Sequence, residues 1–269
     1  MNQLLDPQEL ISTALPGREL CIEFFGLPGS GKSTIASEVH AALSRMDPRM
    51  VFAPSILRDE ASAPLRTAAK IRLILSALTR NGAIWGTLSQ VFAIKQPTFR
   101  DKLRAVSTIA TVISLYSSLG RRRLGAVLDQ GLLQAIWTVQ LRQPAFDGDA
   151  FVASHLKKAA TAGHIYVSVE TPIEVCAKRL DARVSKHSRM QLAGNDQNLD
   201  LWQRAERLRQ TIVHNFRATC RKQGIRPQIV IVDGTEDPKA IANQIVAILQ
   251  QIRAEQLSTR VLQNERMAQ

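Results

Sequence analysis

One short stretch of the sequence combines the residue types that bind phosphate groups. Residues 21–40 read CIEFFGLPGSGKSTIASEVH, in which Gly26, Gly31, Lys32 and Ser33 fit the spacing G-x-x-x-x-G-K-[ST]. Glycines let successive backbone N–H groups turn inward and form a cradle for an anion. A lysine at this position can reach the β- and γ-phosphates of a nucleoside triphosphate, and the serine hydroxyl can ligate Mg²⁺. The spacing therefore predicts a site for ATP and Mg²⁺.

A phosphate-binding loop of this kind requires a strand before it and a helix after it. Residues 21–25 are almost all apolar, which indicates a short buried strand. Apolar residues recur at helical spacing from Ile35 to Leu43, and Asp47-Pro48 indicates where that helix ends. The start of the helix adds about half a positive charge beside the loop. The residues predicted to bind ATP are Gly26, Leu27, Pro28, Gly29, Ser30, Gly31, Lys32, Ser33 and Thr34.

Four more short apolar runs alternate with helical patterns along the chain. They lie at 49–54, 125–129, 164–170 and 228–232. Strands that alternate with helices are typical of βαβ crossovers, so we predict an α/β fold with a parallel sheet. Ligands bind such sheets at the carboxyl ends of the strands. Polar residues that directly follow a strand are therefore the next candidates.

Asp129 ends the third predicted strand. A carboxylate at this edge lies beside the phosphate loop if the third strand neighbours the first. There it can hold Mg²⁺, through water, or take the proton of the phosphate acceptor. The alternative is that Asp129 caps a helix that starts near Gly131.

Arginines form a second group of candidates. The sequence TPIE at 171–174 has the pattern of a capping box and predicts a helix that runs to about Lys186. Arg179 and Arg183 share one face of this helix, and Arg189 lies in the polar loop after it. Guanidinium groups can neutralise the charge on a transferred phosphoryl group. Arg58 follows the second strand and can bind a substrate anion, and Arg179 is a further candidate for contact with the acceptor substrate. For all four arginines, a solvated surface position is the alternative.

The overall composition narrows the classes of function. The 269 residues carry 35 Lys and Arg against 23 Asp and Glu, which gives a net charge of +12. Such a balance fits binding of nucleic acid, an anionic membrane or phosphorylated small molecules. The basic residues are spread through helical patterns, however, and aromatic residues make up only 5% of the chain. Nucleic-acid binding is therefore not favoured.

Cysteine usage and hydropathy indicate the compartment. Three widely spaced cysteines, without a C-x-x-C pair, argue against a zinc site and a disulfide framework. The first residues include acids and lack a long apolar core, unlike a signal peptide. The apolar segment 105–119 is shorter than the roughly 20 residues of a membrane span. We expect a cytoplasmic protein without a transmembrane segment, and a homodimer stays open.

The spacing of these patterns predicts how the chain is organised. An N-terminal extension, 1–18, precedes a P-loop domain at 19–254, and a polar tail, 255–269, follows it. The 70 or so residues at 55–124 read as several helices, roughly 62–80, 84–94 and 98–119, which is longer than one crossover. We predict that this helical insertion after the second strand either covers an acceptor or only buries the sheet. Residues 184–200 are the predicted lid region. Near the end of the chain, a further predicted helix carries one apolar stripe, formed by Ile241, Ile245, Ile248, Leu249 and Ile252.

Taken together, these stretches resemble the thymidylate kinase-like branch of the P-loop nucleotide and nucleoside kinases over about residues 19–253. The segments that carry the resemblance are IEFFGLPGSGKST at 22–34, LRDE at 57–60, LDQG at 128–131, YVSVETPIEVCAKRLDAR at 166–183 and IVIVDGTEDPKAIANQIVAIL at 229–249. The resemblance implies a P-loop NTPase fold with a five-stranded parallel sheet wrapped by helices. It also implies ATP with Mg²⁺ and phosphoryl transfer to a nucleotide or nucleoside.

The resemblance assigns roles to individual residues. Lys32 and Ser33 would hold the triphosphate and the metal, and Asp129 would be the catalytic carboxylate. The acceptor would meet Arg58, while the lid would carry Arg183 and Arg189. Two departures stand out in this sequence. Gln130 replaces an arginine that helps to place the acceptor in these kinases, and Phe25 and Pro28 replace acidic residues common around the family's phosphate loop.

Three other interpretations stay open. One is a P-loop ATPase or GTPase that drives a conformational change on a protein, a membrane or nucleic acid. Against it, the sequence has no N-K-x-D stretch for guanine recognition, and Asp129 is followed by Gln130 and not by a glutamate that would activate water. The second is a phosphate-binding protein that has lost catalysis, which the presence of Gln130 keeps open. The third is a kinase whose small-molecule acceptor is a sugar or an antibiotic.

Overall fold

The computed structural model describes about two thirds of the chain. The described residues are 20–52, 68, 71–72, 74–75, 89, 98–122, 124–142, 164–183, 195–222, 224 and 228–267. Arg58 and Arg189 lie outside these ranges, as do the predicted N-terminal extension, most of the predicted insertion and residues 184–194 of the predicted lid region.

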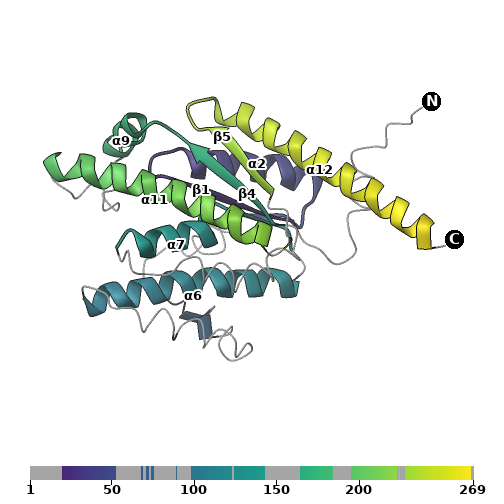
Figure 1. The fold of residues 1–269 in the computed structure, drawn as a ribbon, viewed down its shortest axis with the longest axis horizontal. Helices are drawn as coiled ribbons and strands as arrows, with labels where there is room; N and C mark the ends of the chain where they lie inside the picture. The colour runs from purple at the N-terminus through teal and green to yellow at the C-terminus, as the bar shows by residue number, and fades with distance from the viewer. Residues whose placement is uncertain are drawn as a thin grey trace.

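Five strands form one parallel sheet at the centre of the molecule (Figure 1). They are β1 (Cys21–Gly26), β2 (Val51–Phe52), β3 (Ala126–Leu128), β4 (His164–Glu170) and β5 (Gln228–Asp233). Their order in the sheet is β2-β3-β1-β4-β5, and every neighbouring pair is parallel. The predicted fold class, a P-loop fold with a five-stranded parallel sheet, is confirmed. β2 is shorter than the predicted 49–54 and forms one edge of the sheet.

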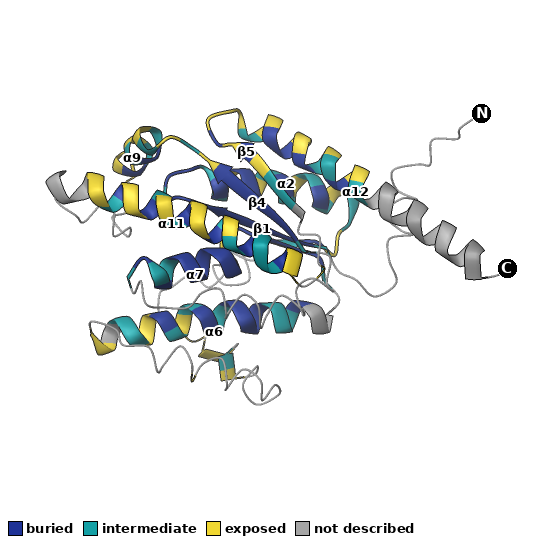
Figure 2. Cartoon of the chain, viewed as in Figure 1, coloured by how far each residue is buried: buried dark blue, intermediate teal, exposed yellow. Residues whose placement is uncertain are grey.

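Among the described residues, six helices whose two ends are defined cover the two faces of this sheet. They are α2 (Lys32–Met46), α6 (Phe99–Arg122), α7 (Leu132–Gln140), α9 (Ile173–Asp181), α11 (Asn195–Lys222) and α12 (Pro238–Met267). One core cluster joins α2 and α12 to one face, and a second joins α6, α7 and α11 to the other. Figure 2 shows the buried residues of α6 and α11 as dark stripes along helices that also carry exposed residues.

The strands are hydrophobic runs because both faces of the sheet are covered. All six residues of β1 and all three of β3 are buried, as expected for central strands of a parallel sheet. Side chains alternate between the faces, so Ile22 and Phe24 pack toward α2 and α12, whereas Phe25 packs toward α6 and α7. Glu23 also lies on the α6 side, where it is completely buried.

The predicted start of α9 is wrong. The sequence predicted a capping box at TPIE, but the helix begins at Ile173, with Pro172 before it and no side-chain cap. The Thr171 hydroxyl instead donates a hydrogen bond to the Ser30 carbonyl of the phosphate loop, at 3.1 Å. A tertiary contact thus takes the group that the local rule assigned to the helix, and α9 ends at Asp181, before the predicted Lys186.

Three other segments compare with their predictions as follows. α6 matches the last helix predicted in the insertion, at 98–119. α11 begins at Asn195, so the last residues of the predicted lid region are helical. α12 carries the predicted apolar stripe, with Ile241, Ile245 and Leu249 buried, but it continues to Met267 into the segment predicted as a polar tail.

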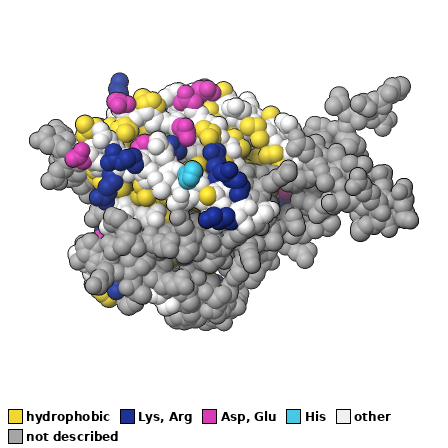
Figure 3. Space-filling view, viewed as in Figure 1, with side chains coloured by type: hydrophobic (Ala, Val, Ile, Leu, Met, Phe, Trp, Pro, Cys, Tyr) yellow, Lys and Arg dark blue, Asp and Glu magenta, His cyan; other side chains and the backbone are white. Residues whose placement is uncertain are grey.

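Basic residues lie on the exposed surface of the described helices, and α11 is one example. Its exposed positions include Arg204, Arg207, Arg221 and Lys222. On the face drawn in Figure 3, the Lys and Arg side chains of the described residues gather in separate groups with other residue types between them. No helix in the described part of the chain is both long and apolar enough to cross a membrane.

Candidate active site

The loop between β1 and α2 has a backbone that requires glycine at two positions. Gly29 and Gly31 have φ angles of +86° and +93°, in the left-handed region that other residues rarely adopt. A Cβ atom on Gly29 would lie 2.3 Å from the carbonyl oxygen of Cys176. The loop is therefore pressed against α9, and the geometry explains two of the glycines in the loop, Gly29 and Gly31.

The orientation of the loop and of α2 suits an anion. The Ser30 N–H donates to the Leu27 carbonyl at 3.1 Å, which closes the turn. α2 begins at Lys32 directly after the loop, and its N-cap, Gly31, offers no side-chain cap. The first N–H groups of a helix have no partner within the helix, so they are available to phosphate oxygens.

Lys32 lies across the loop. Its Nζ donates to the Leu27 carbonyl at 3.0 Å, and the side chain is buried. Burial lowers the pKa of Lys32 to about 8, although the charge of Asp129 acts in the opposite direction. The side chain of Lys32 is thus largely removed from water before a phosphate arrives, so any added negative charge should raise its pKa.

Ser33 and Asp129 meet at the carboxyl edge of the sheet. The Ser33 hydroxyl donates to Oδ2 of Asp129 at 3.1 Å. Their proximity follows from the sheet order, because β3 pairs with β1 and so places Asp129 beside the phosphate loop. Magnesium in kinase sites takes one or two protein oxygens together with substrate phosphates and water, and these two oxygens fit that requirement. Within the described residues, no three His, Cys, Asp or Glu side chains gather into another metal site.

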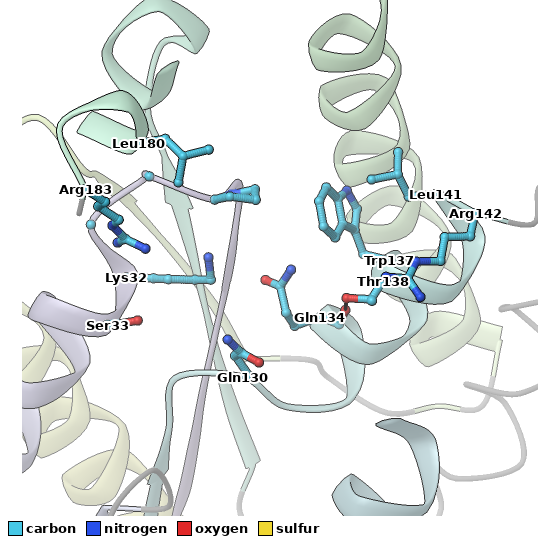
Figure 4. A pocket seen from close by; sticks show the side chains of 13 residues that line it. Lys32, Ser33, Gln130, Gln134, Trp137, Thr138, Leu141, Arg142, Leu180 and Arg183 are labelled. Atoms are coloured by element: carbon cyan, nitrogen blue, oxygen red, sulfur yellow. Dashed lines mark hydrogen bonds between the residues drawn. The ribbon is translucent and has the colours of Figure 1, made fainter. Parts of the chain in front are cut away.

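A cavity of about 330 Å³ opens next to Lys32 and Ser33, a size suited to a small molecule. Its opposite wall comes from α7 and the turn before it, with Gln130, Gln134, Trp137 and Thr138 (Figure 4). In Figure 4 the Lys32 and Ser33 side chains lie across an open space from this wall. The site therefore has two sides, one from the phosphate loop and one from α7.

The α7 wall is anchored at two points. Oε1 of Gln134 accepts a hydrogen bond from the Gly26 N–H at 3.4 Å. The Trp137 ring N–H donates to the Ala205 carbonyl of α11 at 2.9 Å. Gln134, Trp137 and Thr138 were not among the sequence-predicted site residues, although they lie one and two turns after Gln130 and so face the same way. That spacing, counted from the end of a strand, is the signal that could have found them.

The predicted arginines lie in different surroundings. Arg183 is exposed and lines the cavity beside Lys32 (Figure 4). Arg179 points elsewhere: its guanidinium donates to the Gly234 carbonyl at 2.8 Å and to the Ser30 carbonyl at 3.5 Å. A contact of Arg179 with the acceptor stays a prediction, as do the roles of Arg58 and Arg189, which lie outside the described residues.

Glu23 is a buried ionisable residue that sequence reasoning missed. Its Oε1 accepts a hydrogen bond from the Leu133 N–H at 2.7 Å, and the Tyr116 hydroxyl donates to its other oxygen. Burial raises the pKa of Glu23 to about 7, and these hydrogen bonds oppose that rise. The available signal was a single acidic residue inside an otherwise apolar strand.

Comparison with known proteins gives structural neighbours only. No family model and no curated protein matches the chain. Three structures of deoxyadenosine kinase from M. mycoides, with dCMP and dCDP, with dCTP and with dATP, are similar over 86% of this chain and 99–100% of theirs. Sequence identities are 13–14% and TM-scores 0.43–0.45. A likeness of this size carries no argument about activity or substrate, so function has to be inferred from the site itself.

Proposed function

We propose that this chain is an ATP- and Mg²⁺-dependent phosphotransferase, a P-loop kinase of the thymidylate kinase-like type, whose acceptor is a nucleotide or a nucleoside. The observation that carries the proposal is the contact between Ser33 and Asp129 beside Lys32, at the edge of a cavity with a separate α7 wall. A site that only hydrolyses ATP needs room for water, whereas a second wall gives an acceptor molecule a place to bind.

The donor side would bind ATP through the loop and the start of α2. Backbone N–H groups and Lys32 would hold the phosphates, and the oxygens of Ser33 and Asp129 would hold Mg²⁺. A metal ion held there would supply positive charge to offset the negative charge that develops on the transferred phosphoryl group. The burial of Lys32 strengthens its attraction to phosphate, because little water is left to screen it.

The acceptor side would be the α7 wall. Trp137 and Leu141 give this wall an apolar surface, while Gln130 and Thr138 add amide and hydroxyl groups. An aromatic ring beside amides suits a flat base whose edges form hydrogen bonds. This composition supports a nucleoside or nucleotide acceptor. The alternative role for Asp129, in place of holding Mg²⁺, is to receive the proton of the attacking hydroxyl.

Arg183 would act on the transferred phosphoryl group from the open side of the cavity. Its charge lies beside Lys32, where it opposes protonation of the lysine. Two cations next to each other are favourable only when anions lie between them, as they would during phosphoryl transfer. Arg189 and Arg58 are proposed to add to this set from the segments that follow α9 and β2.

A screen for ATP consumption tests the proposal. The full chain is incubated with magnesium-ATP and single nucleosides, nucleoside monophosphates or sugars, against a control without acceptor, and ADP is measured. Lys32→Ala, prepared in the same way, controls for contaminating kinases. We expect a nucleoside or nucleotide to accelerate ADP release.

The other outcomes separate the alternatives. Acceleration by sugars alone would keep the kinase proposal and remove the nucleotide. Rapid ADP release that no acceptor changes would favour an ATPase switch and contradict the proposed transferase.

A further inference from the structure

Glu23 lies at a junction that the proposed donor and acceptor sides share. It belongs to β1, the strand that leads into the phosphate loop, and it precedes Gly26 by three residues. Its side chain is 0% exposed and points to the face covered by α6 and α7. An isolated carboxylate is costly to bury, so its hydrogen bonds indicate what keeps it there.

Those hydrogen bonds go to the start of α7. The N-cap residue of this helix, Gly131, has no side chain to accept a bond. Glu23 accepts from the Leu133 N–H at 2.7 Å, and the Leu132 N–H donates to the Tyr116 hydroxyl at 3.2 Å, which in turn donates to Glu23. Residues distant in sequence thus replace the cap that most helices carry at this position.

The turn before α7 rests directly on the same carboxyl group. A Cβ atom on Gly131 would lie 2.2 Å from the carboxyl carbon of Glu23. Two residues before Gly131, Asp129 accepts from Ser33 at 3.1 Å, and three residues after it, Gln134 accepts from the Gly26 N–H at 3.4 Å. The segment 129–134 is therefore held against β1 and α2 at three places, with Glu23 in the middle.

We propose that Glu23 is a positioning residue, which fixes the turn before α7 and thereby sets Asp129 and Gln134 relative to the phosphate loop. The inference rests on the proposed function for its effect on rate. Its physical basis is that the buried side chain of Glu23, on β1, contacts the turn before α7, where the α7 wall of the cavity begins. Because reacting groups must be aligned closely, a small shift of this turn is enough to slow transfer.

Kinetics of four variants test this role. Glu23→Ala removes every contact, whereas Glu23→Gln keeps the shape and one acceptor oxygen. Tyr116→Phe removes only the bridging hydroxyl. Ser114→Ala is the control, since Ser114 lies buried on the same helix as Tyr116 and its hydroxyl has no hydrogen-bond partner among the described residues.

With the acceptor found in the screen, we expect kcat to fall about 100-fold in Glu23→Ala and about 10-fold in Glu23→Gln. KM for magnesium-ATP should stay within about twofold, because the loop still forms, and the Ser114→Ala variant should match the wild type. Wild-type kcat in both Glu23→Gln and Tyr116→Phe would overturn the proposal, as would a loss of rate that comes entirely from KM. If Glu23→Ala does not fold, these two variants carry the test.

Amide hydrogen exchange provides a measurement that does not depend on turnover. In Glu23→Gln, exchange at Leu132 and Leu133 should become faster, and so should exchange at Gly26, whose N–H is held by Gln134. A residue that only caps α7 would change the two leucines and leave Gly26 unchanged, and that result would overturn the proposal. If the screen finds no acceptor, the proposed function fails there, while the exchange at Gly26 still decides the role of Glu23.

Discussion

Binding of magnesium-ATP to this chain should take up a proton at pH 8, because burial lowers the pKa of Lys32 to about 8 in the free protein. At that pH about half of the molecules carry a neutral amine at this position. Only the ammonium form pairs with phosphate, so a bound triphosphate restores the pKa of Lys32 toward or above its ordinary value of 10.5. The phosphates themselves contribute little above pH 7.5, since their last ionisation has a pKa of about 6.

The expected magnitudes follow from this single ionisation. Proton uptake should be about 0.5 per ATP at pH 8 and about 0.9 at pH 9. The protonated fraction of Lys32 falls from about nine tenths at pH 7 to about one tenth at pH 9, so the affinity for ATP should fall about tenfold, or about 1.4 kcal/mol. The sign is that of a depressed lysine pKa: binding weakens as the pH rises through 8.

Calorimetric titration at pH 8 in two buffers of different ionisation enthalpy measures the proton directly. Lys32→Arg is the matched control, because arginine stays charged throughout this range and can take up no proton. Uptake below about 0.1 proton in the wild type, together with equal affinities at pH 7 and pH 9, would refute the reasoning. Equal uptake in the wild type and in Lys32→Arg would assign the proton to another group.

Three further changes have defined outcomes. Gly29→Ala should weaken magnesium-ATP binding at least tenfold and lower the melting temperature. Gly224→Ala, at a φ of +69° with no atom of the described residues within 4 Å of a Cβ, should cost about 1 kcal/mol of stability and leave binding intact. Similar effects of both substitutions would show that the contact of Gly29 with α9 does not matter. Arg183→Ala should lower kcat and kcat/KM together by about tenfold or more, with unchanged ATP affinity. Its melting temperature should also stay unchanged, because the side chain is exposed. Normal rates in this variant would mean that Arg183 is only a solvated surface residue. In urea unfolding, the wild type should lose about 3 kcal/mol of unfolding free energy relative to Glu23→Gln as the pH rises from 4.5 to 7, because the pKa of Glu23 is raised from 4.5 to about 7. A difference in unfolding free energy between the variant and the wild type that stays flat over this pH range would contradict this. His164 has the opposite effect on the pH dependence of the unfolding free energy. Burial lowers its pKa to about 4, so its contribution to stability rises as the pH rises to about 6.5.

The fold could be predicted from the sequence because its signals are local and periodic. Buried parallel strands are continuous apolar runs, and the phosphate loop has fixed spacing between its strand and its helix. The place of Asp129 beside Ser33 also followed, since it needs only that β3 neighbours β1. These inferences use residues within one element or one pairing rule.

What the sequence could not reveal depends on contacts between distant residues. Glu23 and Leu133 are separated by 110 positions, and no local pattern indicates that an acid on a strand would serve a helix that lacks its own cap. The prediction for Thr171 failed for a related reason. The local sequence predicts that its hydroxyl caps the helix, but in the folded chain this hydroxyl donates to the Ser30 carbonyl at 3.1 Å.

The contacts of Thr171 and Arg179 with Ser30 also explain how the loop is prepared for an anion. Both residues donate to the same Ser30 carbonyl, at 3.1 Å and 3.5 Å. In a planar trans peptide the C=O and the following N–H point in opposite directions. Fixing the Ser30 carbonyl toward α9 therefore directs the Gly31 N–H away from α9. A loop whose carbonyl oxygens are held from outside keeps them away from phosphate, which they would repel, and this accounts for an arginine that lies beside the phosphate loop without lining the cavity.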